Sequence, residues 1–150
     1  MDSNFVFRLR AQVDAPLIVG ESSHGLRRIV PITGGSFEGP RIRGRILPGG
    51  ADWQFVRPDG VLELEARYTL ETDDGALIMV ISRGIRRGSA EVMQRLAQGA
   101  TVDASEYYFR TGLTLEAPAA SAHAWLNQSL FIGIGSREAR AAIIELFEIQ

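Results

Sequence analysis

The sequence contains no cysteine, no lysine and only two histidines in 150 residues. The absence of cysteine excludes disulfide frameworks, thiol nucleophiles, iron–sulfur clusters and cysteine-type zinc sites. The absence of lysine excludes Schiff-base catalysis on a side-chain amine and phosphate binding by a P-loop lysine. His24 and His123 lack the spacing of a metal-binding motif. We therefore expect no metal and no cofactor.

The sequence also lacks long apolar runs and a large excess of charge of either sign. No segment approaches the roughly 20 apolar residues that a membrane-spanning helix needs, and the amino-terminal residues do not form a basic and apolar signal sequence. The formal net charge is -2 and the pI is about 5.7, which gives no reason to expect a nucleic-acid partner. We expect one cytoplasmic domain that binds neither nucleic acid nor membrane.

Arginine supplies all 16 basic residues of the chain. Most of these side chains are expected on the surface, where arginine simply takes the place of lysine. A guanidinium can also hold a carboxylate or phosphate with two parallel hydrogen bonds. Arginine is therefore the only permanently charged group with which this chain can bind an anion.

The dominant sequence period is two, which is typical of half-buried strands. In residues 61–72, apolar side chains alternate with Glu, Arg and Thr. Turns are expected at 57–60, 73–75 and 136–138, where Pro, Asp, Ser and Gly gather. Strands are expected over residues 5–13, 17–20, 26–33, 41–47, 51–56, 61–72, 76–82, 106–116, 130–134 and 141–149. The last segment could instead form a helix over 139–146, although Ile143, Ile144 and Phe147 favour a strand.

One short helix is expected between Ser89, a plausible N-cap, and Gly99, a plausible residue just past the helix end. Eight to ten strands with turn signals every 8–12 residues are typical of a β-sandwich or a β-barrel. We find no internal repeat and no linker that would mark a domain boundary.

Four short segments carry side chains suited to chemistry. Asp52 could act as a general base or could bond the backbone of its own turn. Tyr108 and Arg110 share one strand face and could polarise a carbonyl or enolate oxygen, or the segment could be an aromatic core strand with an outward arginine. The other two segments are Arg67-Tyr68 and His123-Ala124-Trp125-Leu126-Asn127, in which Trp125 offers an apolar wall or a plug at a barrel end.

The order of several motifs resembles the bacterial DUF3237 family, also called UPF0311, over nearly the whole chain. The resemblance implies a single antiparallel β-barrel. In architecture the family is similar to allene-oxide-cyclase and dirigent barrels, which bind hydrophobic small molecules and guide cyclisations without a cofactor. His123 and Ala117 depart from the family pattern, in which Tyr and Thr are more usual. The motifs that carry the resemblance are Gly34-Gly35 with Phe37-Glu38-Gly39, Gly49-Gly50-Ala51-Asp52-Trp53-Gln54, Asp59-Gly60, Ala66-Arg67-Tyr68, Thr72-Asp73-Asp74-Gly75, Tyr107-Tyr108-Phe109-Arg110-Thr111 and Trp125-Leu126-Asn127.

The first hypothesis for function is a cofactor-independent lyase, isomerase or cyclase that acts by acid–base chemistry on a small organic carbonyl or phenolic compound in the barrel. The alternatives are a barrel that binds a hydrophobic ligand without converting it, and a structural or assembly module. A small barrel has room for about one ligand. The expected catalytic residues are Asp52, Arg67, Tyr108, Arg110 and His123, and the expected substrate-binding residues are Trp53, Tyr68, Glu38, Trp125 and Asn127.

Two segments, 76–81 and 130–134, are apolar on both faces. A barrel of this size covers only one face of each strand by itself. We therefore expect the chain to form a homodimer, because two-fold pairing is the commonest way to cover such surfaces.

Overall fold

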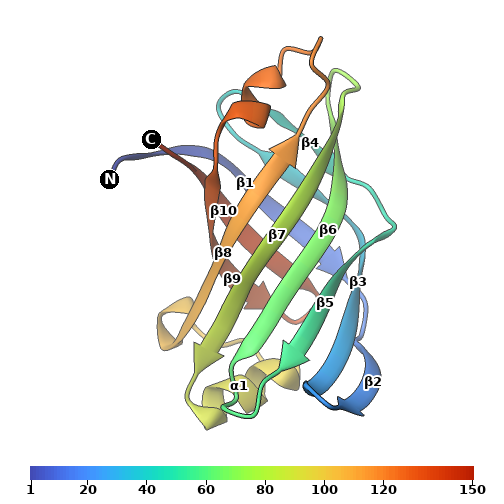
Figure 1. Cartoon of the computed structure of the whole chain (residues 1–150), viewed down its shortest axis with the longest axis vertical. Coiled ribbons are helices and arrows are strands. Elements are labelled where there is room, and N and C mark those ends of the chain that lie inside the picture. Colours follow the sequence, from blue (N-terminus) through green and yellow to red (C-terminus); the bar gives the residue numbers. More distant parts are fainter.

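The computed structural model covers residues 1–150 and shows ten strands and one short α-helix, as the sequence predicts (Figure 1). Eight strand positions close into an antiparallel barrel. The elements are β1 (Ser3–Val13), β2 (Leu17–Ser22), β3 (Gly25–Glu38), β4 (Arg43–Ile46), β5 (Gly50–Val56), β6 (Leu62–Thr72), β7 (Leu77–Gly88), α1 (Ala90–Ala97), η1 (Ala104–Glu106), β8 (Tyr107–Glu116), η2 (Ala124–Gln128), β9 (Phe131–Glu138) and β10 (Ala141–Ile149).

Strand β3 closes the barrel because its two halves have different partners. The second half pairs with β1, where Leu9 lies opposite Phe37. On its other side, β3 pairs first with β5 and then with β4, so these two short strands share one position in the ring. Strand β2 pairs only with the first half of β3 and lies outside the ring.

Inward side chains fill most of the barrel. A core of 26 buried residues runs through it, and its fully buried members include Phe7, Leu70, Ile78 and Phe131. Each such side chain contributes about 1.5–3 kcal/mol by leaving water. The barrel is therefore largely solid, and open space inside it is confined to one region described below.

The two ends of the barrel are covered differently (Figure 1). Helix α1 lies at one end, where Ser89 accepts a hydrogen bond from the backbone of Val92 at 3.1 Å and caps the first turn. Val92 and Leu96 are the buried side chains of this helix. The loop with η2 covers the opposite end, and Leu126 is its buried residue. No helix has the length and apolar character needed to cross a membrane.

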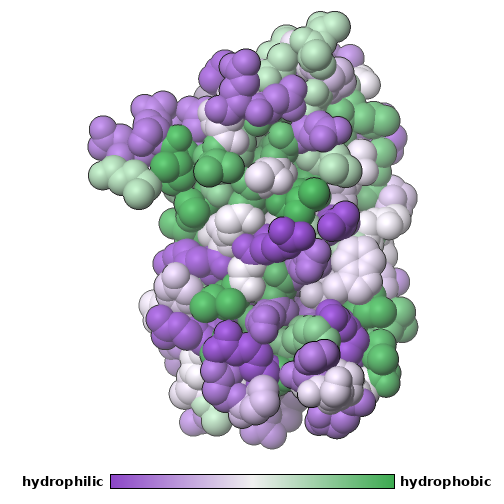
Figure 2. All heavy atoms as spheres, in the orientation of Figure 1, coloured by the Kyte–Doolittle hydropathy of each residue, from purple (hydrophilic) through white to green (hydrophobic).

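The outer surface is not uniform. Leu130, Ile132 and Ile134 of the β9 region are exposed, as is Met79 on β7. The face drawn in Figure 2 carries apolar surface in its upper half, beside the protruding termini, and is largely hydrophilic lower down. Apolar residues from the two segments with two apolar faces, 76–81 and 130–134, therefore lie at the surface.

Three strands continue four or more residues past their predicted ends, and the turn predicted over residues 136–138 is wrong. Strand β3 continues to Glu38, β7 to Gly88 and β9 to Glu138. The glycines that resemble turn signals are instead needed for close packing between strands. A Cβ at Gly135 would approach the Phe109 ring to 2.6 Å, and one at Gly84 would overlap the carbonyl oxygen of Arg110.

Candidate functional site

Charged and polar side chains enter the barrel interior near its α1 end. Asp52 and Gln54 occupy two inward positions of β5, and three arginines come from other strands. Residues an even number of positions apart in a strand face the same side, and each arginine lies at such a distance from buried residues of its own strand. The pairs are Arg28 with Val30 on β3, Arg86 with Ser82 on β7, and Arg137 with Gly133 and Gly135 on β9.

Asp52 has one oxygen occupied and one free. Gln54 donates a hydrogen bond from Nε2 to Oδ2 of Asp52 at 2.8 Å, and Arg28 donates from Nε to Oε1 of Gln54 at 3.1 Å. Oδ1 of Asp52 is shielded from solvent and has no hydrogen-bond partner. The glutamine therefore fixes the carboxyl group while leaving one oxygen available to a bound molecule.

Burial dominates the electrostatics of this carboxyl group. It raises the pKa of Asp52, and this effect exceeds the lowering by the Gln54 hydrogen bond, by the Arg86 charge, by the Glu65 backbone and by the Arg137 charge. Burial also raises the pKa of the neighbouring Tyr68 hydroxyl. The site thus pairs a carboxyl group that holds its proton more tightly than usual with a phenol that remains protonated.

Arg86 is the most buried of the three arginines, with 4% of its surface exposed. Burial lowers the pKa of its guanidinium to about 10, and the positive charges of Arg137 and Arg28 contribute to the same shift. Burial lowers the pKa of those two arginines as well. Nε of Arg86 is shielded and has no hydrogen-bond partner.

A small cavity and a larger cleft meet at this cluster. The cavity, of about 50 Å³, is lined mainly by apolar side chains together with Asp52, Tyr68 and Thr111, whose hydroxyl has no partner. The cleft, of about 360 Å³, is lined by all three arginines and by the carboxyl end of α1. Val13 and Arg137 line both spaces, so the cleft and the cavity adjoin at these two residues.

Two of the residues predicted from sequence, Asp52 and Tyr68, line this cavity. The structure corrects the expectation that the other residues share it. Five of them lie on the outer surface, because they alternate with inward neighbours along their strands. These are Glu38, Trp53, Arg67, Tyr108 and Arg110.

The outward arginines have surface partners. Arg67 lies 3.6 Å from the Glu65 carboxylate. Arg110 donates to the carbonyl oxygen of Phe109 at 2.9 Å, and its guanidinium lies 5.1 Å from the centre of the Tyr108 ring. Tyr108 and Arg110 do share a face, as predicted, but that face points away from the interior.

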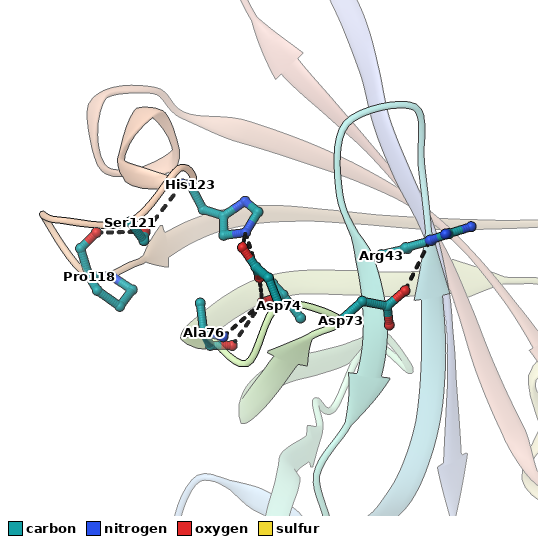
Figure 3. A network of polar contacts seen from close by, with 8 residues as sticks. Arg43, Asp73, Asp74, Ala76, Pro118, Ser121 and His123 are labelled. Atoms are coloured by element: carbon teal, nitrogen blue, oxygen red, sulfur yellow. Dashed lines mark hydrogen bonds and ion pairs between the residues drawn. The ribbon is translucent and has the colours of Figure 1, made fainter.

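His123 belongs to a separate polar group at the opposite end of the barrel (Figure 3). Its Nε2 lies 3.0 and 3.1 Å from the two carboxylate oxygens of Asp74, which also accepts a hydrogen bond from the Thr72 hydroxyl. The Thr72 and His123 hydrogen bonds hold the pKa of Asp74 below its ordinary value. Arg43 pairs with the adjacent Asp73 at 3.0 Å.

Trp125 and Asn127 also lie at that end. The Arg41 guanidinium lies 4.0 Å from the centre of the Trp125 ring. The Asn127 side chain accepts from the backbone N–H of Ala117 at 2.7 Å and donates to its carbonyl oxygen at 2.9 Å. Both contacts hold the loop onto the barrel, so these residues are remote from Asp52.

The sequence analysis missed Arg28, Arg86 and Arg137. In the sequence, each of them can be identified as a charged residue that lies an even number of positions from the apolar, inward-facing residues of its own strand. Nowhere does the structure bring three or more His, Cys, Asp or Glu side chains together as a metal site.

The chain matches one protein family over nearly its full length. A family model described as "Protein of unknown function (DUF3237)" matches residues 1–149. A "UPF0311 protein" of Rhodopseudomonas palustris is 41% identical over 99% of this chain and 97% of the relative. The crystal structure of a conserved protein of unknown function from R. palustris is similar with a TM-score of 0.95, at 39% identity and over 99% and 97% of the two chains.

The fold likeness extends beyond close sequence relatives. The crystal structure of "an enzyme from Penicillium herquei" has a TM-score of 0.73 to this chain, with 20% identity over 99% of this chain and 94% of the other. That likeness concerns the fold alone. The family match and the identity to UPF0311 proteins show that the chain belongs to the DUF3237 family.

Proposed function

We propose that this protein is a cofactor-independent lyase, isomerase or cyclase that moves a proton on a small organic carbonyl or phenolic compound. Asp52 is the acid or base, and the compound binds at the α1 end of the barrel. The observation that carries the proposal is the free, shielded Oδ1 of Asp52 beside a cavity that adjoins the arginine-lined cleft.

The residues divide the chemistry between them. When Asp52 is ionised, Oδ1 takes a proton from a C–H or O–H bond of the substrate. The electron pair of an O–H bond stays on the oxygen, whereas the pair of a C–H bond forms a C=C bond and displaces the carbonyl π electrons onto the oxygen. The guanidinium of Arg86 or Arg137 stabilises the resulting enolate or phenolate, because charge interactions are strong in a site shielded from water. Return of the proton to a different atom completes an isomerisation. In a cyclisation, the enolate or phenolate oxygen first forms a bond to a carbon of a conjugated C=C bond in the same molecule, and the electron pair displaced from that C=C bond takes the proton.

The raised pKa of Asp52 supports this role. A catalytic acid or base works best when its pKa lies close to the working pH, and burial moves this carboxyl group in that direction. Tyr68 lines the same cavity and remains protonated, so its hydroxyl can donate a hydrogen bond to the substrate.

The dimensions of the site limit the substrate. A cavity of about 50 Å³ has room for only a small group such as a methyl. The cleft of about 360 Å³ is within the range of small-molecule sites and holds the rest of the molecule. The description of the P. herquei protein as an enzyme supports catalysis on this fold by analogy.

Proton exchange in heavy water tests the proposal. Phenylpyruvate and benzylacetone serve as probes, since each has an exchangeable C–H next to a carbonyl group. We expect wild-type protein to exchange that hydrogen about 10²–10⁴ times faster than Asp52→Asn, measured by proton NMR. Glu65→Gln, which changes an outward carboxylate on β6, is the matched control and leaves the rate unchanged.

Equal exchange rates for wild type and Asp52→Asn would overturn the assignment of Asp52. A wild-type protein that binds a probe while exchange proceeds at the uncatalysed rate would favour a ligand-binding barrel without catalysis.

A further inference from the structure

We propose that Arg28, Arg86 and Arg137 form a subsite for the carboxylate of a small organic acid, whose apolar part points into the barrel. The inference rests on the proposed function in placing the ligand in the same cleft, and it names the class of molecule that binds there. It depends on the arginines and not on proton transfer by Asp52.

The three arginines of the cluster are partly or fully buried and yet have no ion-pair partner. Seven arginines at the surface, by contrast, lie within 4.0 Å of a carboxylate. None of the three in the cluster has an acidic partner within that distance, and only Arg28 donates to another side chain, the neutral amide of Gln54. Burying a charge without an opposite charge beside it destabilises a protein. A ligand in the cleft therefore supplies the negative charge that the protein does not.

The charge balance of the cluster points to an anion. Three guanidinium groups face one carboxyl group, that of Asp52, which leaves an excess of two positive charges even when Asp52 is ionised. At the rim of the cleft, Asp14 and Arg140 contribute opposite charges that cancel. A bound carboxylate reduces the excess to one.

Arg86 is the natural anchor of the subsite. It is almost fully buried, its Nε has no partner, and it lines the cleft together with Arg28 and Arg137. A guanidinium binds a carboxylate through two parallel N–H groups, which gives both strength and orientation. A ligand held there would lie close enough to Arg137 to reach the cavity beyond it.

The surroundings favour an organic carboxylate over an inorganic anion. The cavity that Arg137 shares with the cleft has 11 hydrophobic residues among the 15 that line it. Phosphate has no apolar part to place against these walls. A carboxylate joined to a small apolar group matches both the guanidinium cluster and the apolar lining.

Calorimetric titration with propionate, propionamide and inorganic phosphate tests the subsite. We expect wild-type protein to bind propionate more tightly than neutral propionamide or phosphate. Arg86→Gln should weaken propionate binding about 10- to 100-fold, the loss expected for a hydrogen bond to a charged group. Arg83→Gln, on the same strand but exposed and paired with Glu65, is the control and retains wild-type affinity.

Arg137→Gln provides a second variant if Arg86→Gln does not fold, and it should weaken propionate binding in the same way. Equal binding of propionate and propionamide, tighter binding of phosphate than of propionate, or unchanged affinity in both variants would overturn the subsite. Asp52→Asn should bind propionate at least as tightly as wild type, since a negative charge is removed. Propionate binding without proton exchange would refute the proposed function and leave the subsite standing.

Discussion

Gln54 fixes Asp52 by a hydrogen bond of 2.8 Å to one carboxylate oxygen and leaves the other oxygen without a partner inside the barrel. Their side chains lie on the same face of β5 because the two residues are two positions apart in a strand. Arg28 in turn donates to Gln54. Asp52 is thereby held in one orientation without the direct ion pair that would lower its pKa.

The pH dependence of folding should reveal the raised pKa of Asp52. Between the ordinary value of 3.8 and the raised folded value, the unfolded chain loses this proton first, so the free energy of unfolding falls as pH rises and levels off above the folded pKa. Asp52→Asn has no carboxyl group at this position, so its free energy of unfolding does not fall for this reason as pH rises. Urea unfolding of both proteins across pH should show wild-type stability declining relative to the variant as pH rises.

Asp103→Asn is a control of opposite sign for that measurement. Hydrogen bonds from the Ser105 backbone and side chain lower the pKa of Asp103, so its contribution to stability is lost as pH falls. A constant difference between wild type and Asp52→Asn at every pH would contradict a raised pKa in Asp52.

Replacing Arg86 with methionine should stabilise the protein without ligand. The buried guanidinium has an unpartnered Nε and lies among like charges, and apolar replacement of buried charged groups is often neutral or favourable. We expect a gain on the order of 1 kcal/mol in the free energy of unfolding, measured by urea titration. Arg83→Met, at an exposed position, should change it by less than about 0.5 kcal/mol.

A loss of several kcal/mol in Arg86→Met, with Arg83→Met unchanged, would mean that Arg86 holds the empty barrel together. The expected gain instead indicates that this arginine is kept for a ligand at a cost in stability.

The fold was predictable from the sequence wherever one strand face is apolar and the other polar. The alternation in residues 61–72 places Leu64 and Tyr68 inside and Arg67 outside, and the structure has them there. Strand β5 is an exception, because a large apolar side chain faces outward and polar side chains face inward. Its large apolar Trp53 is exposed while Gln54 is buried and Asp52 lines the cavity, so hydrophobicity alone favours the wrong face.

The candidate site was only partly predictable because two of its arginines, Arg86 and Arg137, lie beyond the predicted ends of their strands. Gly133, Gly135 and Ser136 resemble a turn in sequence, yet β9 continues through them and carries Arg137 into the site. The bend of β3 likewise depends on pairing with four strands at different points along its length. Such long-range pairing leaves no local signal in the sequence.

Gly84 and Gly112 should respond differently to alanine. A Cβ at Gly84 would overlap the backbone of β8, whereas one at Gly112, on the outer face, meets nothing within 4 Å. We expect Gly84→Ala to lower the free energy of unfolding by about 1–3 kcal/mol through overpacking. Gly112→Ala should raise it by about 0.4–1 kcal/mol through the unfolded state. Thermal and urea unfolding of both variants would measure these changes. Equal changes in the free energy of unfolding for the two substitutions would contradict the close packing of β7 on β8.

The exposed apolar side chains of β7 and β9 should form a two-fold dimer contact. Ile132 lies opposite Gly112 across β8 and β9, and a surface groove of about 410 Å³ there is lined mainly by apolar residues. Sedimentation velocity at micromolar concentration should show dimers for wild type and monomers for Ile132→Glu. Leu17→Glu, at an exposed apolar site on β2, should remain dimeric. A monomeric wild type would refute the contact.

Asp74 and Asp73 are adjacent acids with different surroundings, which makes them a matched pair for testing the far end of the barrel. Hydrogen bonds from Thr72 and His123 lower the pKa of Asp74, so the stability it adds is present above the ordinary carboxyl pKa and is lost as pH falls through the folded value. Asp74→Asn should therefore reduce the acid sensitivity of unfolding between neutral pH and about pH 3.

Asp73→Asn removes only an exposed pair with Arg43 and should change acid sensitivity less. If the two variants lose stability in parallel with wild type, the His123–Asp74 contact does not contribute to folding in solution.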